Sequence, residues 1–425
     1  MNELYCSDSR SGRLTRTAFF LLMIAAGLGE WKPLNRLLYG LPKAFTLGVI
    51  GIALVSILLR PALDRLRFIT PPTLMHLSLM AALLLWSCVI WILQLSGPGT
   101  ILRGCSKIGY QTIALLTASA AVYLFGSKAI DLFTVSISLV NGIILLLEIP
   151  NYGLGGSLRS LIVCILTFGN AEGYARQLEI HDLTFVFGQL VLYYAAFAPH
   201  DPPAERSERR RFLLLCLFFF LTGMKRIAIP AIILFTLAAL LLKDRKNPGP
   251  LLRIGSIGFI VLFLLYIYGI RTGAVAQLFH ALDIDAMGRE HIWQMAGDYY
   301  EFSAFHLGHG FEFVDSIISQ WYSAGLINHP YPFHNDILKV FVELGMPGFL
   351  LWAGLQYVLY PHFWLRYAGT SAALLYCCEL GYMSLTYLTD NSAFYFWSTL
   401  ALRLIVLSYA SRQKIPPASP APNTW

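Results

Sequence analysis

Long apolar runs separated by short polar connections repeat along most of this 425-residue chain. About twelve of the runs approach the length of a membrane-spanning helix, which needs roughly 20 apolar residues. The predicted spans are Thr17–Gly29, Ala44–Leu59, Leu74–Leu95, Gly109–Phe125, Leu132–Leu147, Leu183–Ala198, Phe212–Met224, Ile227–Leu242, Ile254–Ile270, Ile337–Tyr360, Thr370–Leu388 and Ala393–Ala410. We predict helices throughout, because lipid offers no hydrogen-bond partner to an open backbone.

The apolar stretch Phe212–Leu242 has two possible interpretations. One long helix would hold Lys225 and Arg226 near the middle of the membrane, at a cost of several kcal/mol. Two antiparallel spans that turn at Thr222–Lys225 avoid this cost. They also keep each later loop on the side of the membrane that suits its content of basic residues. We therefore predict a helical hairpin here.

Lysine and arginine in the connections set the predicted orientation, because cytoplasmic loops carry an excess of both. A cytoplasmic N-terminus places most of the basic clusters inside. These clusters are Arg60, Arg65 and Arg67; Arg206 and Arg209–Arg211; Lys243, Arg245, Lys246 and Arg253; and Arg412 and Lys414. The first apolar run lacks a small-residue cleavage site, so we expect an uncleaved span. An even number of spans then returns the C-terminus to the cytoplasm.

The predicted spans divide the chain into four parts. Residues 1–270 form an N-terminal membrane bundle of about nine spans, and residues 337–410 form about three C-terminal spans. Residues 271–336 form an extracytoplasmic loop, far longer than an ordinary connection, and loops of this length usually carry function. Residues 411–425 read as a disordered cytoplasmic tail, rich in proline. A second long outer segment, Glu148–Asp182, contains an apolar piece at Leu161–Phe168 that we expect to be a partly inserted helix.

Composition agrees with an all-α, polytopic membrane protein and excludes a soluble globular enzyme. Hydrophobic residues make up 56% of the chain and charged residues 13%, whereas soluble domains carry about 25% charged residues. The net charge of +7 reflects topology and is poor evidence for nucleic acid binding. The seven cysteines include no CxxC pair, which predicts packing roles and no metal site.

Several polar residues are predicted to lie at the outer boundary of the membrane. They are Lys225 and Arg226, Arg271, Arg289 within Gly288–Trp293, His329, His334–Asp336, and Asp390 with Asn391. Arginines at a lipid interface that faces away from cytoplasmic ATP suit a phosphate already attached to lipid. A nearby histidine supplies a base that works at neutral pH.

Each of these residues also has a simpler interpretation. Lys225 and Arg226 can snorkel from a helix end, and Arg289 can pair with its neighbour Glu290. His334 can be an interfacial residue before a helix that Asn335 or Asp336 caps. We expect structural roles for His306 and His309. Glu379 and Arg403, deep within two spans, suggest an interhelical ion pair first and a proton or ion pathway second.

Taken together, the motifs resemble the O-antigen ligase and polysaccharide polymerase superfamily. The segment His334–Gly348 is similar to the family pattern of His-Asn, a spaced leucine and Glu-x-Gly-x-x-Gly entering a membrane helix. Gly288–Trp293 resembles the family's Gly-Arg…Trp segment, and Gly308–Phe311 resembles its Gly-x-Gly-Phe step. Thr222–Arg226 resembles the family's Thr-Gly-Ser-Arg turn, with Lys225 in place of the serine, so only the arginine is matched there.

The resemblance implies a metal-independent glycosyltransferase of the bacterial inner membrane, with no cofactor. Such an enzyme transfers a glycan from undecaprenyl pyrophosphate to a hydroxyl acceptor outside the cytoplasm, with inversion at the anomeric carbon. The expected site comprises His334 as catalytic base, Arg226, Arg289 and Arg271 as pyrophosphate ligands, and Asn335, Asp336 and Lys225 as supporting residues. Gly345 and Gly348 are expected to allow close helix packing.

Two acceptors remain open within the superfamily. A polymerase uses a second lipid-linked glycan, whereas a ligase uses lipid A core or a protein. The His-Asn-Asp run followed by Glu-Leu-Gly-x-x-Gly is more similar to polymerases of O-antigen or exopolysaccharide. Membrane lipids, a chain-length regulator and a flippase are the expected partners. A more distant alternative is a lipid-linked glycan transporter, which favours broken helices and charges near mid-membrane.

Overall fold

The structure is a computed structural model that describes residues 10–31, 33–35, 41–166, 181–198, 203–223, 225–245, 248–282, 289–330 and 332–414. All regular secondary structure in these ranges is helical, as the sequence predicts. The chain divides into two compact units. The first unit comprises Met1–Leu74, Ile113–Thr236 and Phe396–Trp425, and the second comprises Met75–Thr112 and Leu237–Tyr395.

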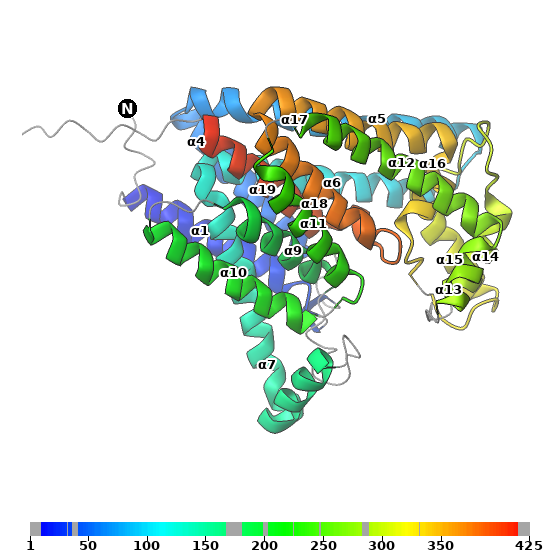
Figure 1. Ribbon diagram of the computed structural model, residues 1–425, viewed down its shortest axis with the longest axis horizontal. Helices are drawn as coiled ribbons and strands as arrows, with labels where there is room; N and C mark the ends of the chain where they lie inside the picture. Colours follow the sequence, from blue (N-terminus) through cyan, green and yellow to red (C-terminus); the bar gives the residue numbers. More distant parts are fainter. Residues whose placement is uncertain are drawn as a thin grey trace, which may run out of the picture. The chain divides into compact units, whose positions relative to one another are not determined.

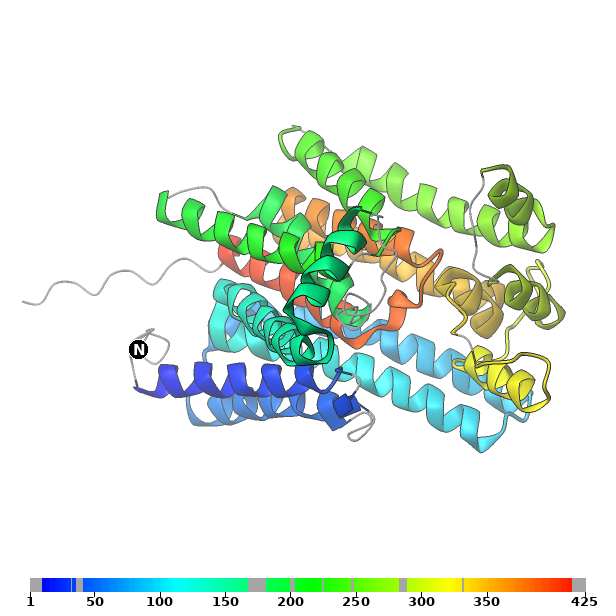
Figure 2. The ribbon, with the colours of Figure 1, turned by 90° about the horizontal axis from the view of Figure 1, so that it is seen from below.

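The first unit is built on long helices from both ends of the chain. Its helices are α1 (Arg10–Leu28), α3 (Leu41–Ala44), α4 (Thr46–Leu59), the beginning of α5 (Leu63–Leu93), the end of α6 (Pro98–Phe125), η2 (Gly126–Lys128), α7 (Ala129–Leu166), α9 (His181–Leu192), the π-helical turn η3 (Tyr193–Phe197), α10 (Pro203–Gly223), the beginning of α11 (Ala228–Lys243) and α19 (Phe396–Lys414). Helix α9 packs against α10 and α19, and α1 packs against α4 and α7 (Figures 1 and 2). A Cβ on Gly27 would lie 2.7 Å from Val140, so this glycine lets α1 and α7 approach closely.

The second unit carries the long loop predicted from the sequence. Its helices are the end of α5, the beginning of α6, the end of α11, α12 (Gly249–Arg271), α13 (Ala274–Ala281), α14 (Arg289–Met295), η4 (Ala296–Tyr299), α15 (Phe313–Ser323), α16 (Asp336–Ala353), the π-helical turn η5 (Gly354–Leu359), α17 (Tyr360–Ala368), α18 (Thr370–Thr386) and η6 (Ser392–Phe394). Helix α12 packs against α16, η5 and α18. The short helices α13, α14 and α15 gather at one end of α12 and α16 (Figure 1).

Each of the predicted spans overlaps a helix of the structure. By length and hydropathy alone, four stretches of the described chain qualify as membrane-crossing: Leu63–Leu93, Pro98–Cys164, Gly249–Arg271 and Asp336–Ala368. Shorter apolar helices lie at Thr46–Leu59, Leu183–Phe197 and Ala228–Lys243. Many large apolar side chains are exposed on these helices, among them Leu58, Ile92 and Leu241, as expected of surfaces that face lipid. A polytopic membrane fold is therefore supported, and the number of spans stays a prediction.

The break predicted between the seventh and eighth spans is confirmed, and their antiparallel packing stays a prediction. Helix α10 ends at Gly223 and α11 begins at Ala228, so Lys225 and Arg226 lie on the turn and not inside a helix. A Cβ on Gly223 would lie 2.2 Å from the hydroxyl of Thr184 on α9. Glycine is needed at this position because α9 leaves no room for a side chain.

Two other predicted boundaries need correction. Helix α7 runs past the predicted end of its span and breaks at Gly153, whose φ of 68° is left-handed. The predicted inserted piece Leu161–Phe168 is helical as far as Leu166, and its last two residues lie outside the described residues. Helix α19 continues to Lys414, four residues into the predicted tail, and the remainder of that tail is likewise undescribed.

The predicted span Ile337–Tyr360 is not one straight helix. Gly345 adopts φ 66° and ψ −175° in the middle of α16. The rings of Phe341 and Phe349 lie 5.8 Å apart, whereas eight residues of straight helix would separate them by about 12 Å along the axis. The segment Asp336–Leu344 therefore folds back against the segment that follows Gly345. Met346–Ala368 remains as a continuous helical path of about 35 Å, enough to cross a membrane.

Candidate functional site

The candidate site begins with the three residues that lead into α16. The Asn335 side chain caps this helix, because its Oδ1 accepts a hydrogen bond from Leu338 N at 3.0 Å. Its Nδ2 donates to the Tyr266 hydroxyl at 3.2 Å, and that hydroxyl donates to Leu388 O at 2.9 Å. The fully buried Asn335 thus ties α16 to α12 and to the turn that follows α18.

His334 stands directly before this cap with an unusual backbone conformation. Its φ of 52° is left-handed, which is uncommon for a residue other than glycine. On its N-terminal side, Trp293 Nε1 of α14 donates to Phe333 O at 3.0 Å. On its C-terminal side, the Asn335 cap fixes the chain. Strained conformations that the surroundings hold in place are concentrated at functional sites.

A carboxylate orients the His334 imidazole. The Nδ1 atom lies 3.4 Å from Asp390 Oδ1, at the long end of hydrogen-bond distances. The His334 side chain keeps 21% of its surface exposed, whereas that of Asp390 keeps only 5%. Asp390 Oδ1 also accepts from Asn391 N at 2.9 Å, which fixes the carboxylate. The imidazole is thus held on one side and open on the other.

Asp336, one of the residues expected to support His334, faces elsewhere. Its N donates to Tyr387 O at 2.9 Å, and its Oδ2 accepts from Ala393 N at 2.6 Å. Its carboxylate therefore binds the loop between α18 and α19. Asp390 is one of the polar residues of the predicted outer face, but its pairing with His334 is not predictable from local sequence, because the two are 56 residues apart.

Arg289 reaches the same turn as the histidine. At the start of α14, its Nη1 donates to Thr389 O at 2.7 Å. Thr389 directly precedes Asp390, so Arg289 and His334 contact adjacent residues of one turn. Glu290, the alternative partner considered from the sequence, instead lies 3.7 Å from His280 Nε2. The structure therefore places Arg289 and His334 at the same turn.

Arg271 and the pair Lys225–Arg226 have other surroundings. Arg271 Nη1 donates to Gly297 O at 2.7 Å, and its guanidinium lies over the Tyr300 ring at 5.6 Å. It joins the end of α12 to η4. Arg226 is exposed and Lys225 is partly buried on the α10–α11 turn, which belongs to the first unit.

One comparison with known proteins covers this region. Residues 212–353 match the O-antigen ligase family. The matched segment contains Arg226, Arg271, Arg289 and His334, and it supports the predicted O-antigen ligase and polymerase superfamily. A search of the curated proteins found no significant match.

Within the segment that matches the O-antigen ligase family, the Glu-x-Gly part of α16 binds the preceding loop. The main-chain oxygen of Glu343 accepts from His309 N at 3.0 Å and Gly310 N at 2.7 Å. Its side-chain Oε1 accepts from Val314 N at 3.0 Å, at the start of α15. Met346 N donates to His306 O at 2.8 Å. The motif thus fastens residues 306–314 to α16.

The two motif glycines have different roles. A Cβ on Gly348 would lie 2.4 Å from the Trp86 indole, so this glycine serves close helix packing as expected. A Cβ on Gly345 would lie 2.1 Å from His306 O, and its φ is positive. Gly345 therefore breaks α16 and lets the backbone at His306 approach closely. The expectation that Gly345 serves helix packing alone is corrected.

A buried ion cluster reinforces the attachment of α15. Lys339 Nζ lies 2.8 Å from Asp315 Oδ2, 3.3 Å from Glu312 Oε1 and 3.9 Å from Glu343 Oε1. Against the upward effect of burial, the Lys339 ammonium lowers the pKa of Asp315 well below its usual value. Burial raises the pKa of Glu312. Only Glu343, four residues further along α16, is close to Lys339 in the sequence. Glu312 and Asp315 come from the N-terminal end of α15, so the sequence pattern does not predict the cluster.

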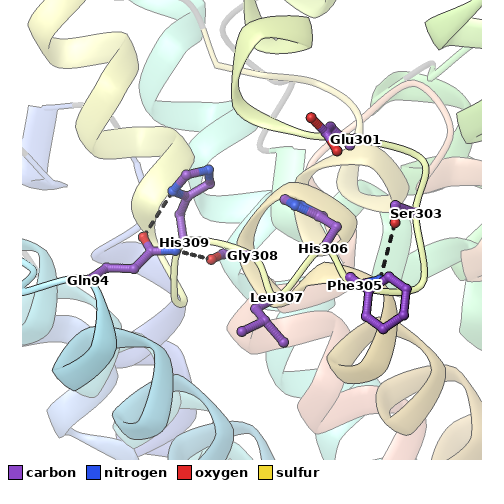
Figure 3. A pocket seen from close by; sticks show the side chains of 8 residues that line it. All are labelled: Gln94, Glu301, Ser303, Phe305, His306, Leu307, Gly308 and His309. Atoms are coloured by element: carbon purple, nitrogen blue, oxygen red, sulfur yellow. Dashed lines mark hydrogen bonds between the residues drawn. The ribbon is translucent and has the colours of Figure 1, made fainter.

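His309 has the structural role expected from the sequence. Its Nδ1 lies 3.0 Å from Gln94 Oε1 (Figure 3), and its Nε2 lies 2.7 Å from Tyr299 O. Its ring stacks on Phe313 with centroids 4.3 Å apart. Burial lowers the pKa of His309, which disfavours its charged form. With both ring nitrogens engaged, His309 is a poor candidate for a catalytic base.

Glu379 and Arg403 are both buried, but their predicted pairing remains a prediction. Glu379 on α18 is fully buried, and neither carboxyl oxygen has a hydrogen-bond partner within the described ranges. Arg403 on α19 belongs to the first unit, whereas Glu379 belongs to the second.

Proposed function

We propose that this protein transfers an undecaprenyl-pyrophosphate-linked glycan to a hydroxyl acceptor at the outer face of the bacterial inner membrane. We further propose that it polymerises O-antigen or exopolysaccharide repeat units. The observation that carries the proposal is the turn at Thr389–Asp390, where Asp390 contacts His334 and Thr389 binds Arg289. The family match over residues 212–353 supports activity of the ligase or polymerase type.

His334 acts as the general base. Asp390 accepts the proton on Nδ1 in a hydrogen bond, which leaves Nε2 as the basic nitrogen. As the acceptor hydroxyl attacks, Nε2 takes its proton, and the acceptor oxygen forms a bond to the anomeric carbon. The bond from that carbon to the phosphate oxygen breaks, and undecaprenyl pyrophosphate leaves with the electron pair. Attack from the face opposite the leaving group inverts the configuration.

Arginines stabilise the leaving pyrophosphate. The planar guanidinium binds phosphate oxygens in pairs, and negative charge grows on these oxygens in the transition state. Arg289 is already oriented by its bond to Thr389 O. Arg271 is engaged with Gly297 and Tyr300, so its contribution to the pyrophosphate site is the least direct of the predicted set.

Arg226 is proposed as a further pyrophosphate ligand because of its expected depth in the membrane. The apolar part of α10, from Phe212 to Gly223, covers about 18 Å, against a hydrocarbon core of about 30 Å. The turn after it then lies below the outer headgroup plane. A lipid pyrophosphate has its phosphates near that depth, because they are joined directly to the buried chain. Lys225 is proposed to support this turn.

The fate of lipid-linked oligosaccharide in a deletion strain tests the choice of acceptor. Loss of a polymerase leaves lipid A core capped with single repeat units. Loss of a ligase leaves long chains on undecaprenyl pyrophosphate, and that result would replace our proposal with the ligase alternative. A transporter is distinguished by purified protein, because only an enzyme joins glycans in detergent without an ion gradient.

A further inference from the structure

A pocket of about 320 Å³ opens in the second unit, beside the segment that binds α16. It is lined by Gln94, Glu301, Ser303, Phe305, His306, Leu307, Gly308 and His309 (Figure 3). It lacks the three predicted arginines and His334. None of the roles proposed above uses it.

The pocket has a rigid frame. Gln94 Nε2 donates to Gly308 O, and Gln94 Oε1 faces His309 (Figure 3). Gly308 lies against the backbone at Gly345, where a Cβ would come within 2.4 Å of Gly345 N. On the other side, Ser303 N donates to Glu301 O at 2.8 Å, and Phe305 N donates to Ser303 Oγ at 3.2 Å. A site fixed in this way loses little entropy when a ligand binds.

The groups at the pocket combine hydrogen-bonding atoms with an open aromatic ring. Glu301 is exposed and presents a carboxylate acceptor, and Ser303 offers a hydroxyl. Phe305 is 90% exposed, unusual for so large an apolar side chain. Sugars carry hydroxyls on their edges and C–H groups on their faces, so a pocket lined by both a carboxylate and an aromatic ring matches both surfaces. A lipid tail would leave the carboxylate without a partner.

The first part of α16 connects His334 to the pocket. The segment Asp336–Leu344 starts beside His334 and ends at Gly345, next to the pocket. Nine residues of helix cover about 13 Å. A short oligosaccharide spans such a length, so an acceptor with its reactive hydroxyl at His334 can place later sugars in the pocket.

We propose that this pocket is an acceptor subsite that binds sugar units of the acceptor glycan, with Phe305 as the stacking surface and Glu301 as the hydrogen-bond acceptor for sugar hydroxyls. The proposal rests on the proposed function, because it takes the acceptor to be a glycan. It places recognition of the acceptor on the 301–309 segment and recognition of the donor on the arginines.

The test separates acceptor from donor kinetics. Donor is the lipid-linked repeat unit extracted from the source strain, and acceptor is the lipid-free oligosaccharide of the same repeat. Phe305→Ala is expected to raise the KM for acceptor about three- to tenfold, with kcat and the KM for donor unchanged. Glu301→Gln should act in the same direction, and Phe305→Trp should retain most of the acceptor affinity.

Tyr322→Ala, which removes an exposed aromatic ring from α15, is the matched control and should behave as wild type. Saturation-transfer NMR with the lipid-free oligosaccharide gives a second readout that needs no turnover, and its signal should fall in Phe305→Ala. If both pocket variants keep the acceptor KM and the NMR signal of wild type, the subsite is refuted. If the variants instead lower the amount of folded protein in the membrane while the acceptor KM of the folded fraction stays that of wild type, the role of the two residues is structural and the subsite is equally refuted. Failure of the wild type to transfer glycan, with oligosaccharide still bound, contradicts the proposed function and not the pocket.

Discussion

His334 and Asp390 are the pair of side chains on which removal of the acceptor proton depends. His334 occupies a left-handed backbone conformation held by Trp293 and Asn335 on either side. A loop without these contacts would relax to a commoner conformation and withdraw the imidazole from Asp390. The strain is therefore consistent with a side chain that must point in one direction.

Asp390→Asn tests the positioning role of this carboxylate. The amide oxygen can still accept from Asn391 N, so folded protein should accumulate normally. We expect kcat to fall on the order of 10²-fold, because the imidazole loses its fixed orientation. The loss should fall on kcat with the KM for donor unchanged, because the carboxylate orients the base and does not bind the pyrophosphate. Asp298→Asn, an exposed carboxylate on η4, serves as control. A wild-type kcat for Asp390→Asn would assign Asp390 a structural role only.

Arg226→Lys tests the pyrophosphate role of the α10–α11 turn. The substitution keeps the positive charge but removes the bidentate geometry that suits phosphate. We expect most transfer to be lost while the amount of folded protein is unchanged. Lys225→Gln on the same turn should be milder, because the family resemblance places serine at that position. Transfer from purified lipid-linked donor is the measurement, and a near wild-type rate for Arg226→Lys would return this residue to the role of a snorkelling anchor.

Among the helices, α16 matters most for the site, because it is broken at Gly345. Gly345 lets Asp336–Leu344 fold back, so that the two ends of this short segment lie at His334 and at residues 306–308. An unbroken helix would carry the motif straight through the membrane and lose the bonds from Glu343 to His309 and Gly310.

Gly345→Ala should therefore reduce stability strongly. Gly345, with φ 66° and ψ −175°, occupies a region that is essentially restricted to glycine. A side chain there costs about 1–3 kcal/mol, and here the added Cβ also meets His306 O. We expect a lower melting temperature in detergent and loss of activity. Gly354→Ala is the matched control, because no atom lies within 4 Å of its added Cβ. Equal melting temperatures for the two variants would show that the break at Gly345 is not required.

The helices were largely predictable from the sequence, and the contacts between them were not. Apolar runs located every span to within a few residues at one end or more, and the cost of burying Lys225 and Arg226 predicted the break between α10 and α11. Local chemistry also predicted the Asn335 cap. The pairing of His334 with Asp390 and the contacts of Lys339 with Glu312 and Asp315 depend on tertiary packing, which periodicity does not encode. The break at Gly345 was hidden because glycine is also common where helices pack closely.

At the scale of the whole molecule, the proposal requires the long loop and the 203–211 segment to lie on opposite sides of the membrane. Single cysteines at Ser323 on α15 and Ser207 on α10, both exposed, test this in a background with Cys105 replaced. An impermeant maleimide should label the Ser323 position in intact cells and the Ser207 position only after permeabilisation. Labelling of both positions in intact cells would overturn the orientation and every site assignment that follows from it.

Transfer of glycan from lipid pyrophosphate by His334 is the central claim, and one reconstituted reaction tests it most directly. Purified protein is supplied with lipid-linked repeat units and a chelator, without nucleotide sugar, and both lengthened glycan and released undecaprenyl pyrophosphate are quantified. Wild type should form both products in equal amounts. His334→Asn, which tolerates the left-handed backbone but is no base, should fold and lose about 10²–10⁴-fold in rate. Transfer at the wild-type rate by His334→Asn, or no transfer by the wild type, would contradict the claim.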